Sequence, residues 1–281
     1  MKGALYIVST PIGNLEDITL RALRILKEVD IVAAEDTRHS LKLLNHYGIT
    51  KPLISYWGEK EKVKADEVIR KLNDGKSVAL ISDAGTPGIS DPGNVLIRKA
   101  IEEGIDVVPI PGPSAFVAAL SMSGFSAEEF VFIGFLPAKQ SQRLKELKEL
   151  SFEKRTLVIY EAPHRIQESV HDISDVFGKR RAVVVKELTK LYEEILRGDI
   201  SEIAAKLADS KIAGEYVIVV EGRLEEKTHN TDDAMEEIKL LMKKGIRRKD
   251  AVSQIAEEYG LSKKVLYDKS LAGENALLSD E

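Results

Sequence analysis

Short, mostly apolar runs alternate with longer amphipathic segments along most of this chain, and this alternation is the feature that most limits its fold. Residues 31–34, 77–81 and 105–110 have the length and apolar character of strands, whereas residues 18–29 and 63–72 repeat apolar side chains at helical spacing. Strands that alternate with helices at such intervals indicate a mostly parallel sheet with helical connections. The sequence therefore predicts an α/β fold.

The alternation restarts about midway along the chain, which predicts two α/β domains. We expect an N-terminal α/β domain at residues 1–120 and a C-terminal α/β domain at residues 121–224. A polar linker, residues 225–233, precedes a small helical domain at residues 234–267, and the tail at residues 268–281 is expected to be disordered. A chain of 281 residues, 43% of them hydrophobic, is long enough to bury the cores of two domains.

Several classes of protein are excluded or disfavoured by composition. The chain contains no cysteine, which excludes disulfides and thiolate metal sites, and its five histidines show no metal-ligand spacing, so we expect no metal. No apolar run approaches the ~18 residues of a membrane span, and the first residues resemble a strand rather than a secretory signal. We therefore expect a cytoplasmic protein without membrane contact.

The net charge of −5 argues weakly against a nucleic-acid partner, because phosphate binding needs positive potential. Five basic residues nevertheless fall within seven positions from Lys243 to Lys249. This cluster is either a solvated helix end or a contact for a phosphate backbone. The surrounding helices also have helix–turn–helix spacing, which is a weak signal because many helical bundles share it.

A glycine- and proline-rich loop, residues 82–94, follows the strand at residues 77–81. A connection there needs only about two to six residues, and glycines let backbone N–H groups approach a ligand closely. Residues 10–14, 35–39 and 111–115 form similar loops after other strands, at the sheet edge where open α/β folds bind ligands. We expect a site at this edge, with residues 89–94 capping the next helix.

Two further clusters allow both a structural and a functional interpretation. Asp36 either caps a helix or takes part in the site, while Arg38 at a strand end suits phosphate recognition. His164 and Arg165 lie near a helix N-terminus, which favours anions, although His164 also fits a structural role. No G-x-G-x-x-G follows the first strand and no G-x-x-x-x-G-K-[ST] occurs, so nucleotide-phosphate motifs give no support.

Seven motifs, in order along the chain, closely resemble those of the ribosomal RNA small subunit methyltransferase I family, in the tetrapyrrole methylase superfamily. They are Tyr6-Ile-Val-Ser-Thr-Pro-Ile-Gly-Asn14, Glu35-Asp-Thr-Arg38, Asp83-Ala-Gly-Thr-Pro-Gly-Ile-Ser-Asp-Pro-Gly93, Pro111-Gly-Pro-Ser-Ala115, Gly134-Phe-Leu-Pro137, Glu161-Ala-Pro-His-Arg165 and Lys186-Glu-Leu-Thr-Lys190. The resemblance covers residues 5 to 222. It departs at Lys186, where arginine is expected, and at Ser9, where alanine is usual; lysine keeps the charge but lacks the bidentate fork.

The resemblance implies an S-adenosylmethionine-dependent methyltransferase that acts on a cytidine 2′-hydroxyl of 16S ribosomal RNA, within the 30S subunit. It implies two α/β domains with the cofactor in the cleft between them, and a homodimer. The implied cofactor contacts are Thr10, Pro11, Asp83, Thr86, Ser114, Ala115, Tyr160, Glu161, Ala162, Leu188 and Tyr216.

The implied reaction is an in-line attack of the ribose 2′-oxygen on the sulfonium methyl, for which the protein mainly positions the reactants. Glu187, Lys186 and His164 are open alternatives for a residue that takes the proton. The expected contacts to RNA phosphates are Arg38, Arg165 and Lys190.

Two other functions are compatible with parts of the pattern. The first is methylation of a tetrapyrrole or of a modified protein residue on the same scaffold, against which the RNA-type motifs at residues 35–38, 161–165 and 186–190 argue. The second is a non-catalytic RNA-binding assembly factor that uses the helices at residues 234–267. That factor would bind RNA without binding S-adenosylmethionine.

Overall fold

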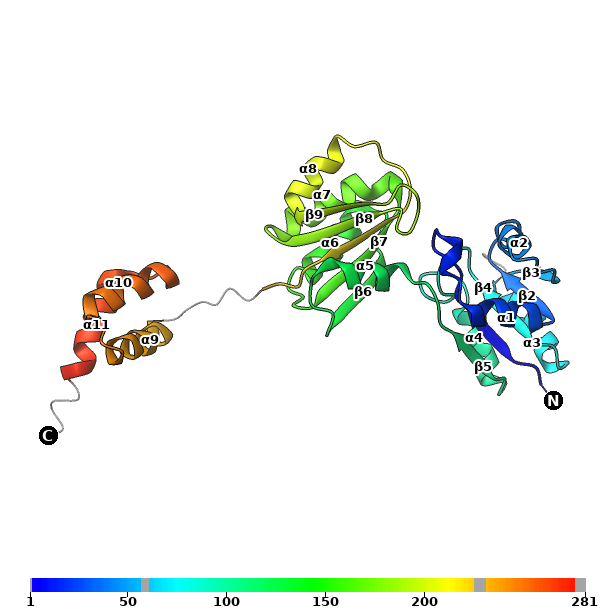
Figure 1. Cartoon of the computed structure of the whole chain (residues 1–281), viewed down its shortest axis with the longest axis horizontal. Coiled ribbons are helices and arrows are strands. Elements are labelled where there is room, and N and C mark those ends of the chain that lie inside the picture. The colour runs from blue at the N-terminus through cyan, green and yellow to red at the C-terminus, as the bar shows by residue number, and fades with distance from the viewer. Residues whose placement is uncertain (1, 57–60, 225–230, 276–281) are drawn as a thin grey trace. The chain divides into compact units, whose positions relative to one another are not determined.

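The computed structural model describes residues 2–56, 61–224 and 231–275. Contacts within the chain divide it into two compact units, Met1–Arg223 and Leu224–Glu281 (Figure 1). The first unit contains two five-stranded sheets, which confirms the α/β fold class. In the described part of the chain, no helix has the length and apolar character of a membrane span.

The first sheet is entirely parallel and has the order β3-β2-β4-β1-β5. Buried side chains cover both of its faces: one cluster joins it to α1 and α2, and another joins it to α3 and α4. The carboxyl ends of its strands therefore meet at one edge, as predicted. Its elements are β1 (Leu5–Val8), α1 (Leu20–Glu28), β2 (Ile31–Ala34), α2 (Thr37–His46), β3 (Leu53–Ser55), α3 (Glu61–Asn73), β4 (Val78–Ile81), α4 (Asn94–Glu102) and β5 (Val107–Ile110).

The second sheet is mixed, with the order β6-β7-β10-β8-β9. Strands β6 and β7 pair in parallel, whereas the other three pairings are antiparallel. The connection from β8 to β9 is too short for a helical crossover, so these neighbours run antiparallel. The elements are α5 (Ala115–Ser123), β6 (Phe130–Phe135), α6 (Gln140–Leu150), β7 (Thr156–Glu161), α7 (Ile166–Phe177), β8 (Arg181–Lys186), β9 (Glu194–Asp199), α8 (Ile200–Ala208) and β10 (Tyr216–Val220).

Helix α5 packs on one face of the second sheet, and α6, α7 and α8 pack on the other. Strand β10 shows how the sequence supports this: Tyr216, Ile218 and Val220 face one cluster, while Val217 and Val219 face the other. A strand buried on both faces is apolar throughout instead of alternating, and β10 is Tyr-Val-Ile-Val-Val.

The second unit consists of α9 (Thr231–Lys243), α10 (Arg248–Tyr259) and α11 (Lys263–Asn275) around a small apolar core. Helix α11 continues past residue 268, where we expected the tail to begin. Leu266 and Ser270 are both buried and lie four positions apart, so the helix keeps a packed face that apolar periodicity alone did not reveal. Residues 225–230 of the expected linker and 276–281 of the expected tail lie outside the described residues.

Candidate functional site

A cavity of about 360 Å³ lies within the first unit and is lined by residues from loops and strand ends of both sheets. This volume is in the range of small-molecule sites, about 300–1,000 Å³. The cavity is lined by Ile12, Ala84, Gly85, Thr86, Ile89, Ser90, Asp91, Ser114, Ala115, Phe135, Tyr160, Glu161, Ala162, Pro163, Leu188, Glu215, Tyr216 and Val217.

The loops after β1 and β4 are joined by backbone hydrogen bonds. The Thr10 amide donates to the Gly85 carbonyl at 2.8 Å, and the Gly85 amide donates back to the Thr10 carbonyl at 3.0 Å. Gly85 has φ +78°, a conformation that glycine adopts without a steric penalty. Thr10 and Pro11 are both buried, and neither is among the residues that line the cavity.

Thr86 lines the cavity and its hydroxyl lies 2.8 Å from the hydroxyl of Ser9. Ser9 is buried just after the end of β1. This contact orients a cavity-lining hydroxyl. The loop at residues 111–115 packs against the same serine: a Cβ built on Gly112 would lie 2.8 Å from the Ser9 Cβ.

Tyr160 at the end of β7 joins the aromatic part of the wall to α5. Its hydroxyl accepts a hydrogen bond of 3.0 Å from the Phe116 amide, in the first turn of α5. The Tyr160 ring makes edge contacts with Phe132 and Phe135, with centroid distances of 5.0 and 5.8 Å. Burial raises the pKa of Tyr160 above its usual value, the Phe116 amide opposes this shift, and the Asp91 charge adds to it.

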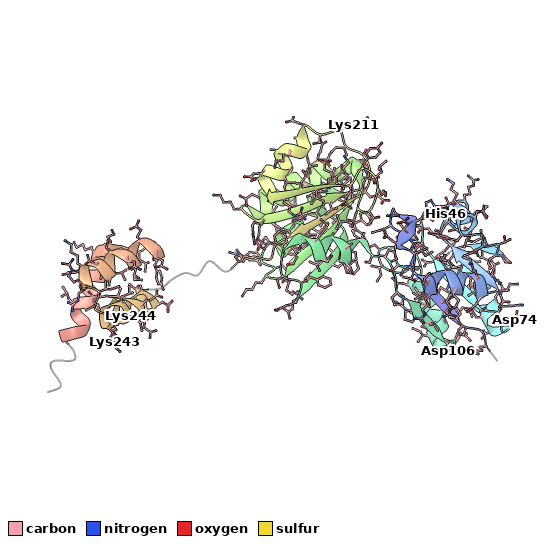
Figure 2. The ribbon with its side chains drawn as sticks, viewed as in Figure 1. His46, Asp74, Asp106, Lys211, Lys243 and Lys244 are labelled. Atoms are coloured by element: carbon pink, nitrogen blue, oxygen red, sulfur yellow. The ribbon has the colours of Figure 1, made fainter. Side chains whose placement is uncertain are left out.

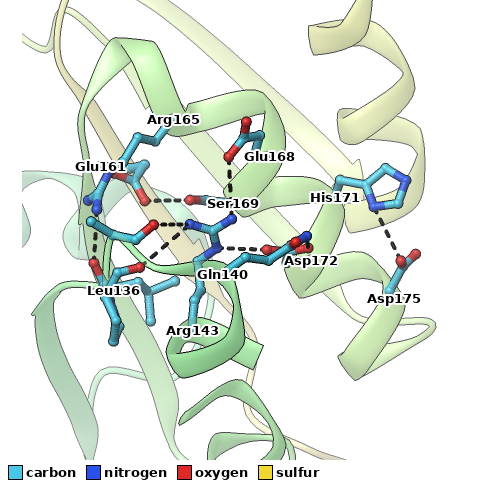
Figure 3. Close-up of polar contacts among 12 residues, drawn as sticks. Leu136, Gln140, Arg143, Glu161, Arg165, Glu168, Ser169, His171, Asp172 and Asp175 are labelled. Atoms are coloured by element: carbon cyan, nitrogen blue, oxygen red, sulfur yellow. Dashed lines mark hydrogen bonds and ion pairs between the residues drawn. The ribbon is translucent and has the colours of Figure 1, made fainter. Parts of the chain in front are cut away.

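A network of polar side chains supports this wall from the side of α7 (Figure 3). Glu161 Oε1 accepts from Arg165 Nε at 2.9 Å and from Arg165 Nη2 at 2.5 Å, and Glu161 Oε2 accepts from the Ser169 hydroxyl at 2.6 Å. Arg165 Nη1 also donates to the Leu136 carbonyl at 3.2 Å. Arg165 was predicted to bind RNA phosphates; these contacts instead favour an internal role in holding the segment after β6.

A second buried arginine holds the same segment. Arg143 on α6 is 1% exposed, and its Nε donates to Asp172 Oδ2 on α7 at 2.7 Å (Figure 3). Arg143 Nη1 donates to the carbonyls of Pro137 and Ala138 at 3.5 and 3.3 Å. Phe135, which lines the cavity, is therefore followed by a segment whose carbonyls are held by two arginines.

The segment from Lys186 to Lys190 has an unusual backbone, with Glu187 at φ +51° and Thr189 at φ +67°. Glu187 Oε1 accepts from Lys190 Nζ at 2.8 Å and from the Glu215 amide at 2.9 Å. Burial raises the pKa of Glu187, but the hydrogen bonds from Lys190 and the Glu215 amide outweigh it, so this pKa lies below its usual value. These contacts present Leu188 to the cavity and favour a positioning role for Glu187 over that of a base.

Glu187→Gln should therefore lower the free energy of unfolding by about 1–3 kcal/mol at neutral pH, since it weakens charge-assisted hydrogen bonds. A carboxyl whose pKa is depressed by folding stabilises the protein above its unfolded pKa, and this stabilisation is lost as pH falls through the folded value. Urea titrations at pH 7 and at acidic pH should show the difference shrinking in acid. Glu194→Gln, at an exposed carboxylate 3.4 Å from Lys186, is the matched control; an equal effect there would contradict this role.

The remaining predicted residues lie away from the cavity lining. Lys186 shares a sheet face with Ala182 and Val184 in the cluster beneath α7 and α8, and its Nζ is 3.4 Å from Glu194 Oε2. His164 is exposed in the short 3-10 turn Pro163–Arg165. Arg38 is exposed on α2, and no ion pair involves its side chain within residues 2–56, 61–224 and 231–275.

Asp83 also lies off the cavity. Its Oδ1 accepts a hydrogen bond of 3.1 Å from the Asp36 amide, and its own amide donates to Glu35 Oε2 at 3.4 Å. Burial raises the pKa of Glu35, and the charges of Asp83 and Asp36 add to this, against the hydrogen bond from the Asp83 amide. Asp83 therefore joins the ends of β2 and β4 and shapes the site from outside its lining.

Of the eleven predicted cofactor contacts, the cavity brings together Thr86, Ser114, Ala115, Tyr160, Glu161, Ala162, Leu188 and Tyr216. Sequence reasoning assigned residues 89–94 to a helix cap, yet Ile89, Ser90 and Asp91 line the cavity. It also missed Phe135 and Glu215. The sequence feature that could have pointed to Asp91 is the turn sequence Asp-Pro-Gly that it begins, because glycine- and proline-rich turns are typical of ligand-binding loops. Within the described residues, no group of three or more His, Asp or Glu side chains could hold a metal ion.

Comparison with known proteins identifies relatives over nearly the whole chain. The family model of the tetrapyrrole (corrin/porphyrin) methylases matches residues 4–204. A protein named ribosomal RNA small subunit methyltransferase I from Halalkalibacterium halodurans is 44% identical over 272 residues, covering 95% of this chain and 94% of the relative. Proteins of the same name from Pseudomonas aeruginosa and Bacillus subtilis are 45% and 41% identical, covering 96% and 95% of this chain and 97% and 93% of the relatives.

Solved structures share the fold at much lower identity. A uroporphyrin-III C-methyltransferase from Thermus thermophilus, complexed with S-adenyl homocysteine, has a TM-score of 0.57 at 19% identity and covers 78% of this chain and 97% of its own. The cobalt precorrin-4 methyltransferase CbiF has a TM-score of 0.57 at 18% identity, with coverages of 78% and 94%. These neighbours support the two-sheet architecture of the first unit.

Proposed function

Because the chain belongs to the ribosomal RNA small subunit methyltransferase I family of the tetrapyrrole (corrin/porphyrin) methylases, we propose that it methylates the 2′-oxygen of a cytidine in 16S ribosomal RNA. The chain is a methyltransferase and its methyl donor is S-adenosylmethionine. The observation that carries the proposal is the cavity at the carboxyl edge of the first sheet, which the family's motifs line.

The cavity residues fit this cofactor. Bound S-adenosylmethionine supplies a methyl group on a positively charged sulfur, and three carboxylates line the cavity: Asp91, Glu161 and Glu215. Small residues such as Ala84, Gly85 and Ala115 leave room for a ligand. The residues that would hold the cofactor are Thr86, Ser114, Ala115, Tyr160, Ala162, Leu188 and Tyr216.

We propose 16S RNA within the 30S subunit as the partner. Arg38 is exposed after β2, on the same sheet edge as the cavity loops, and suits a phosphate contact. The second unit offers Lys243, the last residue of α9, and Lys244 directly after it (Figure 2). Arg247 is the N-cap residue of α10, and Lys249 lies in the first turn of that helix. Such contacts bind the phosphate backbone without reading sequence. We also propose a cytoplasmic location, which a ribosomal substrate would require.

A homodimer is the oligomeric state that we propose. Strand β6 is an edge strand of the second sheet, and α5 lies on the sheet's less covered face. Val117 on α5 is 52% exposed and Phe130 on β6 is 39% exposed. An open apolar edge of this kind is normally covered by a partner, and a second copy would do so symmetrically.

The decisive experiment is to map 2′-O-methylation on 30S RNA after reaction with the purified protein and labelled S-adenosylmethionine. We expect one methylated cytidine ribose. Ala115→Phe, which introduces a ring at the cavity, should abolish labelling, whereas Ile101→Phe, at an exposed position on α4 away from the cavity lining and the proposed dimer surface, should retain it. Labelling of an offered porphyrinogen instead of RNA, or RNA binding without cofactor binding by calorimetry, would refute the proposal.

A further inference from the structure

The three carboxylates that line the cavity differ in what they contact. Glu161 is held by Arg165, with Nε at 2.9 Å and Nη2 at 2.5 Å from its Oε1. Glu215 Oε2 lies 3.0 Å from Lys190 Nζ. Asp91 makes no ion pair with a lysine or arginine within the described part of the chain. Among the residues that the structure describes, Asp91 is therefore the lining carboxylate without a lysine or arginine in an ion pair.

The loop holds Asp91 in a defined place. The Gly88 amide donates to the Pro92 carbonyl at 3.3 Å, and the Gly93 amide donates to Glu61 Oε1 at 3.1 Å. Ser90 has φ +62°, which for a residue other than glycine costs of the order of 1 kcal/mol and persists where the surroundings enforce it. A Cβ built on Gly134 would lie 3.1 Å from the Ser90 hydroxyl, so this part of the loop closely approaches β6.

The charges around Asp91 are negative. Burial raises its pKa to about 6; Glu35 adds to the shift, a hydrogen bond from Ser82 opposes it, and Asp83 and Glu215 add further. The charge of Asp91 in turn contributes to the raised pKa of Tyr160. A general base works best with a pKa near the pH at which the enzyme operates. Asp91 thus combines a place on the cavity with suitable basicity.

The rim next to Asp91 is open and apolar. Ile89 is 42% exposed and Phe135 is 53% exposed, although both line the cavity. Exposed aromatic and aliphatic side chains of this kind suit the faces of an unstacked base, which an enzyme must reach to modify a nucleotide. Ile89, Phe135 and Asp91 line the same cavity, so a nucleotide received at this rim would have Asp91 within the site that its ribose enters.

We propose that Asp91 is the catalytic residue that accepts the proton of the attacking 2′-hydroxyl. The inference rests on the proposed function. As the 2′-oxygen forms its bond to the methyl carbon, its O–H proton passes to an Asp91 carboxylate oxygen. The carbon–sulfur bond breaks in the same displacement, and its electron pair stays on sulfur, so the cationic donor becomes a neutral thioether. The carboxylate later returns its proton to water.

The test is Asp91→Asn, assayed by single-turnover methylation of 30S subunits at saturating S-adenosylmethionine. We expect the rate to fall about 10²–10⁴-fold, the usual contribution of general-base catalysis. The wild-type rate should rise with pH through the acidic range and level off, because Asp91 must be ionised, and this rising limb should be absent in Asp91→Asn. Asp106→Asn, at an exposed carboxylate before β5, is the matched control and should retain the wild-type rate (Figure 2).

Calorimetry distinguishes this role from simple attraction of the cation. If Asp91 only attracts the sulfonium, the asparagine variant loses affinity for S-adenosylmethionine, keeps affinity for the neutral S-adenosylhomocysteine, and reacts at the wild-type rate when saturated. That outcome overturns the proposal. A flat wild-type pH profile overturns it too, even if Asp91→Asn does not fold. If wild-type protein fails to methylate RNA at all, the proposed function fails instead.

Discussion

Glu161→Ala is expected to lower the free energy of unfolding by about 3–5 kcal/mol, because it leaves a largely buried guanidinium without its counterion. The Glu161 side chain is fully buried and that of Arg165 is 14% exposed. The substitution also removes the acceptor of the Ser169 hydroxyl and of the Ala162 amide, at 2.6 and 2.7 Å. Urea titration followed by circular dichroism measures the loss.

Glu168→Ala is the matched control for Glu161→Ala. Glu168 lies on α7, its side chain is 73% exposed, and its Oε2 is 3.5 Å from Arg143 Nη2 (Figure 3). Exposed ion pairs contribute about 0–1 kcal/mol, and Arg143 keeps Asp172 as its partner. Removing Arg165 together with Glu161 should recover part of the loss, since no charge is then left unpaired. Equal effects of the two alanine substitutions would contradict the role of the buried pair.

The same buried pair shows where sequence reasoning reached its limit. The motif Glu161-Ala-Pro-His-Arg165 identified a strand end followed by a helix, and the structure has both there. The motif did not reveal that Arg165 turns back to Glu161 and to the Leu136 carbonyl. The sequence alone allowed Arg165 to bind either an RNA phosphate or a carboxylate of the protein. The fold shows that it contacts the Glu161 carboxylate.

The strand ends of the first sheet were predictable because a parallel sheet brings them to one edge, whatever the details of packing. Asp91 was not, because its place on the cavity and its raised pKa depend first on burial and then on the charges of Glu35, Asp83 and Glu215, which lie far apart along the chain. Likewise, the pairing of Glu187 with Lys190 and the Glu215 amide depends on positive φ angles at Glu187 and Thr189. Glutamate and threonine do not predict such a backbone conformation. Local sequence identified the loops, and tertiary packing decided which side chains line the cavity.

Gly112→Ala should weaken binding of S-adenosylmethionine about tenfold or more without abolishing folding. The added Cβ would lie 2.8 Å from the Ser9 Cβ, closer than two such carbons approach, so the loop at residues 111–115 must move away from β1. Overpacking of this kind typically costs about 1–3 kcal/mol. Since Ser114 and Ala115 line the cavity from this loop, the displacement should alter the proposed cofactor site. Calorimetric titration measures the change in affinity.

Ser9→Gly combined with Gly112→Ala separates this contact from other effects of the alanine. Gly112 does not have a positive φ, so its substitution by alanine introduces no backbone strain. The loss of affinity should therefore arise from the steric clash with the Ser9 side chain. Ser9→Gly alone loses the 2.8 Å contact with the Thr86 hydroxyl and gains backbone freedom, and should itself weaken binding modestly. The double variant should bind more tightly than the sum of the single effects predicts, because the glycine removes the carbon that the alanine would meet. Strict additivity would mean that the loop at residues 111–115 is not held by its packing on β1.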